Sequence, residues 1–322
     1  MEKVSIIIPV YNEEENIVPL TEELHKVLQG YDFEIIFVND GSVDRTADKI
    51  QALKKKNITL IEFTKNFGQS LAMAAGISYA KGEFIVTIDG DLQNDPANIP
   101  EMLKKLKDEG WDMVAGYRQK RKDPFFSRIL PSRIANFIIR LLTGVHFRDY
   151  GCTLKVFRAD LAKNIELYGE LHRFIPVLAA FEGARITQMP VNHHPRHSGR
   201  SKYGIGRTFR VMSDLLLILF LKKYFLRPMH LFGTTGVIIL LAGVLINLYL
   251  LAIKILGNDI WGKPLLFLAI LLVIGGIQLI TIGIFAEFLM RIYFNSSDKL
   301  PYRIKKITTG NHEEQTQISP HA

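Results

Sequence analysis

Two aspartates separated by a glycine follow an apolar run of the sequence. Asp89, Gly90 and Asp91 come directly after residues 83–88, and Gln93 stands two positions later. Because residues i, i+2 and i+4 of an extended segment project from one side, we expect Asp89, Asp91 and Gln93 to share a face. Such oxygen ligands suit Mg²⁺ or Mn²⁺, which keeps waters and takes phosphate oxygens of a substrate as further ligands. Asp-x-Asp also occurs in loops that bind nothing, but its place after a buried strand favours a divalent metal site.

A group of histidines offers a second metal hypothesis. His193, His194 and His197 lie close together in the sequence, and clustered histidines can bind zinc. Cys152 is distant, and Pro195 interrupts the spacing. We therefore favour a polar loop in which one or two histidines contact a substrate, with zinc as the alternative.

The residues before about position 205 alternate between two kinds of apolar pattern. Short continuous apolar runs predict strands covered on both faces, and runs with helical spacing lie between them. The predicted strands are residues 4–10, 33–38, 58–63, 83–88 and 112–115, and the predicted helices are residues 16–28, 44–55, 70–79 and 99–106. This order predicts an α/β fold, a Rossmann-like and mainly parallel sheet with helices on both faces.

Polar residues follow four of these strands at the point where each one ends. They are Tyr11 and Glu13, Asp40 and Ser42, Lys65 and Asn66, and Asp89 and Asp91. Ligands of such sheets bind beyond the carboxyl ends of the strands, so we expect a binding site there. The first strand is followed neither by Gly-x-Gly-x-x-Gly nor by a P-loop, which argues against a dehydrogenase and a P-loop NTPase.

Two apolar stretches near the end of the sequence have the length of membrane-spanning helices. They are residues 231–253 and about 265–288, joined by a short link. Basic residues flank the pair on the outside: Lys222, Lys223, Arg227, Arg291, Arg303, Lys305 and Lys306. The positive-inside rule then predicts a multi-pass protein of the inner (plasma) membrane with both ends in the cytoplasm. Glycines in both stretches favour close packing and are compatible with a homo-oligomer.

The remaining parts of the chain complete a four-part organisation. Residues 1–205 form the cytoplasmic domain, and residues 206–228 form amphipathic helical structure in the membrane interface, or a buried domain helix as the alternative. Residues 229–294 are the transmembrane hairpin. Residues 295–322 are a polar cytoplasmic tail, whose part from 308 onward is expected to lack regular structure.

The composition is basic, with a formal net charge of +8 and a pI near 9.4. Nucleic acid, an anionic membrane surface and phosphorylated substrates would all suit this balance. The basic flanks of the apolar stretches favour the membrane, and we expect no nucleic-acid partner. The single cysteine allows no intrachain disulfide.

Several motifs resemble those of the family-2 glycosyltransferases of GT-A fold. They are SIIIPVYNE at residues 5–13, VNDGSVD at 38–44, KNFGQ at 65–69, DGDLQ at 89–93, RDYGC at 148–152, and Arg196 with SGRSKYG at 198–204. Within that family the chain is most similar to the polyisoprenyl-phosphate glycosyltransferases. These include dolichol-phosphate mannose synthase and bacterial undecaprenyl-phosphate glucosyltransferases with two C-terminal transmembrane helices. The resemblance covers residues 3–295.

The resemblance implies roles for individual residues. The nucleotide-sugar donor would contact Pro9, Tyr11, Glu13, Asp40, Gln69 and Asp89. A metal on the donor diphosphate would be held by Asp89, Asp91 and Gln93, and the catalytic residues would be Asp91 and Asp149. Asp149 matches a position that acts as a base or orients the acceptor. Arg200, Ser201 and Lys202 match a phosphate-binding loop.

The chemistry of a phosphate acceptor refines these roles. A phosphate monoester has its second pKa near 6, so at neutral pH it is mostly dianionic and needs little help from a base. Two anionic substrates must approach each other, and nearby cations would reduce their repulsion. The candidates are Arg128, Arg133, Arg196, Arg200 and Lys202, each of which could instead be a solvated surface residue.

Together these features predict a metal-dependent, inverting hexosyltransferase. We expect it to move glucose from UDP-glucose to undecaprenyl phosphate at the cytoplasmic face of the membrane, for use in the cell envelope. UDP-N-acetylglucosamine, a UDP-aminosugar and GDP-mannose are alternative donors. A soluble acceptor and a non-catalytic scaffold that binds nucleotide sugars are alternative functions. Polymer synthesis is disfavoured, because Trp111 and Trp261 do not stand in a Gln-x-x-Arg-Trp motif.

Overall fold

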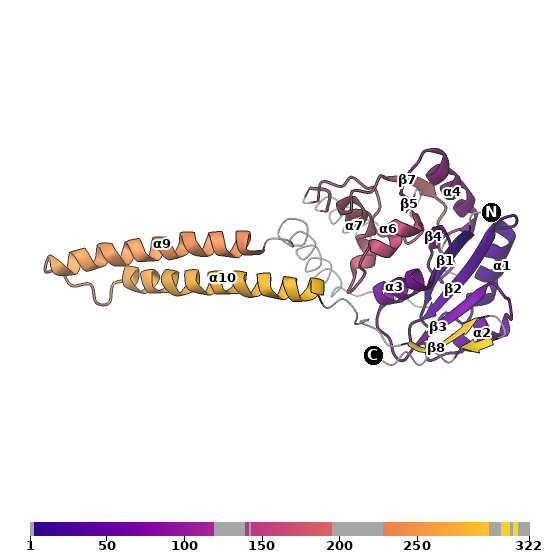
Figure 1. The fold of residues 1–322 in the computed structure, drawn as a ribbon, viewed down its shortest axis with the longest axis horizontal. Helices are drawn as coiled ribbons and strands as arrows, with labels where there is room; N and C mark the ends of the chain where they lie inside the picture. The colour runs from indigo at the N-terminus through magenta and orange to yellow at the C-terminus, as the bar shows by residue number, and fades with distance from the viewer. Residues whose placement is uncertain are drawn as a thin grey trace. The chain divides into compact units, whose positions relative to one another are not determined.

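A computed structural model describes residues 3–118, 139–141, 143–194, 228–295, 304–309 and 312–314. The chain divides into two compact units. We call Met1–Leu215 with Leu300–Ala322 the sheet unit, and Leu216–Lys299 the hairpin unit. Figure 1 shows both, and each is described separately below.

The described strands of the sheet unit form one nine-stranded sheet of order β7-β5-β6-β4-β1-β2-β3-β8-β9 (Figure 1). They are β1 (Lys3–Val10), β2 (Asp32–Asn39), β3 (Ile58–Phe63), β4 (Phe84–Thr87), β5 (Met113–Arg118), β6 (Lys155–Arg158), β7 (Ile186–Val191), β8 (Ile304–Thr309) and β9 (His312–Glu314).

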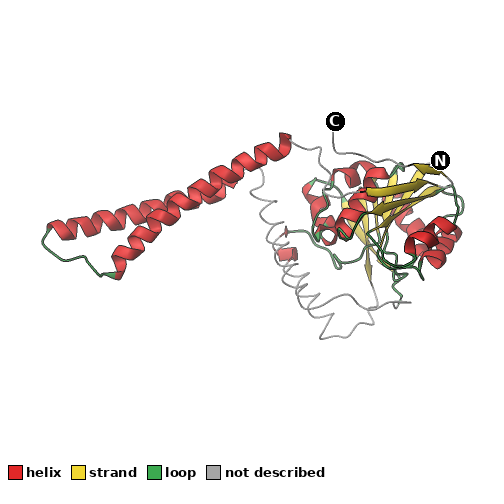
Figure 2. Ribbon diagram, turned by 90° about the horizontal axis from the view of Figure 1, so that it is seen from below, coloured by secondary structure: helices red, strands yellow, loops and turns green. Residues whose placement is uncertain are grey.

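Helices cover both faces of this sheet (Figure 2). They are α1 (Ile17–Val27), α2 (Thr46–Ala52), α3 (Gln69–Tyr79), α4 (Ile99–Asp108), α6 (Ala159–Asn164) and α7 (Ile175–Phe181), with short 3₁₀ turns η1 (Pro96–Asn98) and η3 (Leu171–Arg173). The predicted α/β class with helices on both faces is confirmed.

The sheet is mixed rather than mainly parallel. Strands β3, β2, β1 and β4 are parallel neighbours, as the alternating pattern predicted, and β5 is parallel to β7. Strand β6 runs antiparallel between β4 and β5, and β8 runs antiparallel to β3. The sequence analysis missed β6 because it has four residues, two of them charged, and it missed β7 and β8 because their apolar residues alternate with polar ones.

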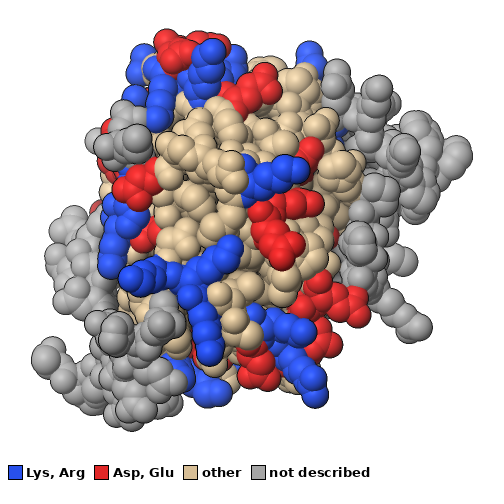
Figure 3. Space-filling view, turned by 90° about the vertical axis from the view of Figure 1, so that its right-hand side faces the viewer, with Lys and Arg blue, Asp and Glu red and all other residues tan. Residues whose placement is uncertain are grey.

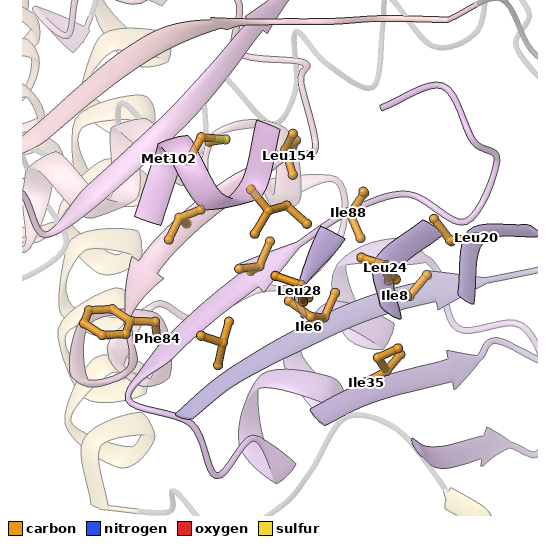
Figure 4. Close-up of a cluster of buried hydrophobic side chains, with 14 of the residues drawn as sticks. Ile6, Ile8, Leu20, Leu24, Leu28, Ile35, Phe84, Ile88, Met102 and Leu154 are labelled. Atoms are coloured by element: carbon orange, nitrogen blue, oxygen red, sulfur yellow. The ribbon is translucent and has the colours of Figure 1, made fainter. Parts of the chain in front are cut away.

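The main core lies between the sheet and helices α1 and α4. Ile6 and Ile8 of β1 point into it beside Leu24 of α1 and Met102 of α4, and all four side chains are buried (Figure 4). Ile7 projects from the opposite face, as the twofold alternation of a strand requires. There Gly76 lets α3 approach so closely that an added Cβ would lie 2.3 Å from Cγ2 of Ile7.

The C-terminal tail differs from its prediction. Residues 308 onward were expected to lack regular structure, but Thr308 and Thr309 belong to β8, and His312–Glu314 form β9. Strand β8 continues the sheet beyond β3, and its Ile307 is buried. Short strands with mostly polar residues resemble disordered tails in composition, and in β8 only Ile307 is buried.

The hairpin unit consists of two long apolar helices, α9 (Pro228–Ile255) and α10 (Pro264–Asn295). Within them, Met229–Ile255 and Pro264–Leu289 are long and apolar enough to cross a membrane. Most of their large apolar side chains, including Leu245 and Phe285, are exposed, as a helix in lipid requires.

Glycines bring the two apolar helices together. An added Cβ on Gly236 would lie 2.8 Å from the carbonyl oxygen of Gly276, and one on Gly243 would lie 2.8 Å from the backbone nitrogen of Val273. Close backbone approach at small residues is typical of helix pairs in membranes. The predicted close packing of the spans is therefore present within one chain.

Replacing Gly76 by alanine tests the contact between α3 and the sheet. Overpacking of this kind costs about 1–3 kcal/mol, more than the ~1 kcal/mol that alanine gains over glycine inside a helix. We expect Gly76→Ala to lower the melting temperature of the detergent-solubilised protein. Ser78→Ala, at an exposed position of the same helix, is the matched control and should leave the melting temperature nearly unchanged. An unchanged melting temperature for Gly76→Ala would contradict the packing described.

Candidate active site

A cleft of about 220 Å³ opens at the carboxyl ends of the parallel strands. Its walls come from the end of β1, from the segments that follow β1, β2, β3 and β4, and from the start of α3. The lining residues are Pro9, Val10, Tyr11, Glu13, Asp40, Asn66, Gly68, Gln69, Asp89, Gly90 and Asp91. Seven residues that the sequence analysis assigned to the donor or the metal are among them: Pro9, Tyr11, Glu13, Asp40, Gln69, Asp89 and Asp91.

Asp40 organises the wall formed by the loop before α3. Its carboxylate accepts hydrogen bonds from the backbone N–H groups of Phe67, at 2.6 Å, and Gly68, at 2.9 Å. Burial raises the pKa of Asp40, and the two N–H donors oppose that rise by favouring the anion. Gly68 has φ +101°, a conformation that favours glycine. The loop is thus tied to the end of β2.

The segment after β1 is tied to the segment after β2. The backbone N–H of Asn12 donates to Ser42 Oγ, and that of Glu13 donates to Thr46 Oγ1, both at 2.9 Å. Asn12 adopts φ +54°, which turns the chain sharply after the strand. These bonds hold Tyr11 and Glu13 at the cleft and explain the polar residues that the sequence places at both strand ends.

Asp89 occupies the floor of the cleft. Its Oδ1 accepts from Gln69 Nε2 at 2.8 Å, and its Oδ2 accepts from Thr153 Oγ1 at 2.7 Å. Burial and then the neighbouring charge of Asp91 raise the pKa of Asp89 to about 6. The glycine between the two aspartates allows close packing, because an added Cβ on Gly90 would lie 2.8 Å from Cγ1 of Val10.

The backbone after Asp89 is not extended, contrary to the sequence analysis. Gly90 and Asp91 form a turn, and Leu92 has φ +59°. Asp91 Oδ1 accepts a hydrogen bond of 3.2 Å from the backbone N–H of Gln93, as in an Asx turn. Both carboxylates line the cleft, whereas Gln93 is not among its described lining residues. The role of Gln93 as a metal ligand stays a prediction.

The carboxylates at the cleft floor suit a divalent cation that takes most of its ligands from substrate phosphates and water. Two carboxylates share a buried position, and the charge of Asp91 disfavours ionisation of Asp89. A cation between them would remove that repulsion, and Mg²⁺ or Mn²⁺ needs only one or two protein carboxylates beside substrate phosphates and water. The described residues contain no cluster of three His, Cys, Asp or Glu side chains arranged as a metal site.

Asp149 lies next to the cleft in a two-pronged ion pair with Arg118. Arg118 Nε donates to Oδ2 at 2.6 Å, and its Nη2 donates to Oδ1 at 2.9 Å. The backbone N–H of Gly151 also donates to Oδ1, at 3.1 Å. A carboxylate whose two oxygens accept from a guanidinium is held in place as an anion. This geometry suits an orienting role better than that of a mobile proton acceptor.

The start of the histidine loop packs against the segment after Asp91. Asn94 and His193 form an isolated β-bridge, and the backbone N–H of His194 donates to the carbonyl oxygen of Gln93 at 2.8 Å. His194 Nε2 lies 3.5 Å from Asp95 Oδ2. The loop therefore begins beside the carboxylates, as a substrate-contacting loop requires.

Some predicted residues lie outside the part of the chain that the structure describes. They are Arg128, Arg133, Arg196, Arg200, Ser201 and Lys202, together with His197 and the amphipathic segment 206–227. Their roles stay predictions.

Sequence reasoning missed three residues near the carboxylates. Arg118 pairs with Asp149, Thr153 donates to Asp89, and Lys155 is 2% exposed. Lys155 could have been noticed, since a charged residue stands between Leu154 and Val156 in an otherwise apolar run. Nothing in the sequence pattern marks Thr153 or Arg118.

Replacing Asp40 by alanine tests how the cleft wall is held. The change leaves the partly buried N–H groups of Phe67 and Gly68 without their acceptor, which costs about 1 kcal/mol. We expect a lower melting temperature and weaker binding of UDP by calorimetry. Asp48→Ala, at an exposed position of α2, is the control. Unchanged UDP affinity in a folded Asp40→Ala protein would rule out this role.

Comparison with known proteins connects this geometry to a family. The glycosyl transferase family 2 model matches residues 5–166. A dodecaprenyl-phosphate galacturonate synthase of Rhizobium johnstonii is 43% identical over 313 residues, which are 95% of this chain and 93% of that protein. An undecaprenyl-phosphate 4-deoxy-4-formamido-L-arabinose transferase of Edwardsiella ictaluri is 32% identical over 324 residues, 98% of this chain and 97% of that protein.

Solved structures show the same fold. Glucosyl-3-phosphoglycerate synthase from Mycobacterium tuberculosis, in complex with Mn²⁺, UDP and phosphoglyceric acid, has a TM-score of 0.53 at 15% identity and covers 69% of this chain and 78% of its own. The N-terminal part of TarS from S. aureus, in complex with UDP-GlcNAc, has a TM-score of 0.50 at 18% identity, covering 68% and 67%. The resemblance predicted from the motifs is confirmed: the chain belongs to glycosyl transferase family 2, with a GT-A-like fold.

Proposed function

We propose that this chain transfers a sugar from a nucleoside diphosphate donor to a polyprenyl phosphate at a membrane surface. The observation that carries the proposal is the presence, in one chain, of a carboxylate cleft and a pair of apolar helices. The relatives that match both parts are named as polyprenyl-phosphate sugar enzymes, at 43% and 32% identity. An intact cleft with both carboxylates at its floor argues against a non-catalytic scaffold.

The cleft suits the donor. Tyr11, Glu13 and Asp40 line the end that we assign to the nucleoside, and Asp89 and Asp91 line the floor that we assign to the diphosphate. A divalent metal bound there would neutralise the diphosphate and stabilise its charge as it leaves. Gln69 and Thr153 hold the Asp89 carboxylate still, so little reorganisation is needed when the donor binds. Mn²⁺ in the similar solved structure supports a divalent metal but does not distinguish it from Mg²⁺.

The reaction is one displacement. An oxygen of the lipid phosphate attacks the anomeric carbon, the bond from that carbon to the diphosphate breaks, and the nucleoside diphosphate leaves with the electron pair. The attacking oxygen is already anionic near neutral pH, so no strong base is needed. We assign Asp149, fixed by Arg118, to the orientation of the acceptor. A single displacement inverts the configuration at the anomeric carbon.

The fold supports a hairpin whose two ends lie on one side of the membrane. The sheet unit precedes α9, and after α10 the chain returns to the same sheet as β8. Two membrane crossings would bring the chain back to the side from which it left, where β8 joins the same sheet. The basic flanks support a cytoplasmic location for the sheet unit.

Nucleic acid is a poor partner for the face shown in Figure 3. On the face shown in Figure 3, Lys and Arg side chains are interspersed with Asp and Glu and form no continuous basic field. Proteins that bind nucleic acid through its phosphates gather their positive charge on one face. We therefore assign the basic excess of this chain to the membrane and to phosphorylated substrates.

The comparisons change which donor sugar we expect. Glucose was the expected sugar among several alternatives, but the relatives reported above are named for galacturonate and for a formamido-arabinose. Because the galacturonate synthase is the more similar of the two, at 43% against 32%, we propose UDP-galacturonate as the donor. UDP-glucose, UDP-N-acetylglucosamine, a UDP-aminosugar and GDP-mannose remain the competing donors.

A donor panel tests the function. Purified protein is incubated with undecaprenyl or dodecaprenyl phosphate, Mn²⁺ or Mg²⁺, and each nucleotide sugar in turn, and glycolipid is detected by mass. We expect a lipid-phosphate hexuronate from UDP-galacturonate, with the opposite anomeric configuration to the donor, and no product without lipid phosphate. Product from UDP-glucose alone would restore the earlier expectation. Transfer to a soluble acceptor without the lipid, or no transfer from any donor, would refute the proposal.

The raised pKa of Asp89 predicts how metal binding depends on pH. In the metal-free protein this carboxyl keeps its proton up to about pH 6, so protons compete with the metal below that value and cease to compete above it. We expect Mn²⁺ measured by spin resonance to bind more weakly at about pH 5 than at about pH 7.5. Asp91→Ala should weaken Mn²⁺ binding at both pH values and lower kcat by about 100-fold or more. Equal affinity at the two pH values, or full activity of Asp91→Ala, would contradict the assignment.

A further inference from the structure

Lys155 is a buried lysine in the interior of the sheet. It opens β6, which runs antiparallel to β4, and it lies opposite Thr87. Because the two strands are antiparallel, the start of β6 lies at the carboxyl end of β4, where Asp89 and Asp91 follow. Lys155 is 2% exposed and is among the largest fully covered side chains of the described residues.

Its ammonium group bonds to the segment that supports Asp89. Lys155 Nζ donates to the carbonyl oxygen of Cys152. The next residue, Thr153, donates through Oγ1 to Asp89 Oδ2, and its own carbonyl oxygen accepts from Thr87 Oγ1, both at 2.7 Å. A short chain of contacts thus joins Lys155 to one of the two carboxylates in the cleft floor.

Lys155 interacts electrostatically with Asp89 in the cleft floor and with Asp149. Burial lowers the pKa of Lys155, while the negative charges of Asp89 and Asp149 oppose that change. The surrounding carboxylates are Asp89, Asp91 and Asp149, and the cations are Arg118 and Lys155.

A purely structural role explains this residue poorly. Burying an ammonium group is costly, and an apolar residue of similar volume usually stabilises a fold at least as well. Buried charges are therefore expected where the charge itself is used, and a positive charge fixed beside a departing diphosphate has such a use.

We propose that Lys155 is a positioning residue of the transfer reaction: it supports Asp89 through the Cys152–Thr153 segment and supplies a fixed positive charge shared by the metal-binding carboxylates and Asp149. The proposal rests on the proposed function. It adds a residue between the donor floor and the Asp149–Arg118 pair. Because a positively charged Lys155 and the metal repel each other, removing the charge of Lys155 favours metal binding. The same change removes stabilisation of the negative charge that develops on the leaving group.

Three substitutions separate the charge from the hydrogen bond. Lys155→Gln keeps a donor for the Cys152 carbonyl but removes the charge, Lys155→Met removes both, and Lys155→Arg keeps the charge. Lys163→Gln, at an exposed position of α6, is the control. For each protein, kcat and KM are measured with the active donor, and Mn²⁺ binding is measured by spin resonance in the presence of UDP.

We expect Lys155→Gln to lower kcat by about 10- to 100-fold while binding Mn²⁺ more tightly than the unchanged protein. KM for the lipid phosphate should stay the same, since Lys155 is covered. Lys155→Met should lose more activity, and Lys155→Arg should recover most of it. A folded Lys155→Gln protein with unchanged kcat, or with weaker Mn²⁺ binding, would overturn the proposal, the second result by showing that the site has merely been disrupted.

The two proposals fail separately. If the unchanged protein makes no glycolipid from any donor, the proposed function fails, and the Mn²⁺ comparison still decides whether the charge of Lys155 acts on the carboxylates. If glycolipid forms and Lys155→Gln matches the unchanged protein, only the role of Lys155 fails. Should Lys155→Met not fold, the Gln and Arg variants carry the same test.

Discussion

The repulsion between two carboxylates at the end of one buried strand is the constraint on which this site depends. Asp89 and Asp91 share the floor of a cleft, where burial and then the charge of Asp91 raise the pKa of Asp89 to about 6. Hydrogen bonds from Gln69 and Thr153 hold Asp89 against this repulsion, and Lys155 is buried nearby. Such an arrangement is stable only because the rest of the sheet fixes it, and it gains most when a divalent cation and an anionic donor arrive together.

The remainder of the sheet unit positions this floor. Parallel strands bring the segments after β1, β2 and β4 to one edge, and hydrogen bonds between those segments hold the cleft walls. The hairpin unit has a different task. Its helices expose apolar side chains that lipid would cover, so a polyprenyl acceptor can keep its tail in the bilayer while its phosphate reaches the interface. After the hairpin the chain returns to the same sheet as β8, so the sheet unit contains segments from before and after the hairpin in the sequence.

Sequence patterns predicted the parallel centre of the sheet and the grouping of polar residues at its strand ends, for physical reasons. Strands buried on both faces are continuous apolar runs, and parallel strands place their polar ends together, so Tyr11, Asp40 and Asp89 could be grouped before the fold was known. Strand β6 could not be found this way, because Lys155 interrupts its apolar pattern. Strand β8 pairs with residues more than two hundred positions away, and no local pattern reports such a partner. The turn at Leu92 was missed because a positive φ at leucine has no sequence signal.

The most direct measurement of the central claim is the position of a metal and a diphosphate in the cleft. Crystals or frozen particles of the protein with UDP and Mn²⁺ would locate both, and anomalous scattering from manganese would identify the ion. The account predicts manganese bound by carboxylate oxygens of Asp89 or Asp91 and by the diphosphate, with the uridine beside Tyr11 and Asp40. Manganese or UDP bound at a place that does not involve these carboxylates would contradict it.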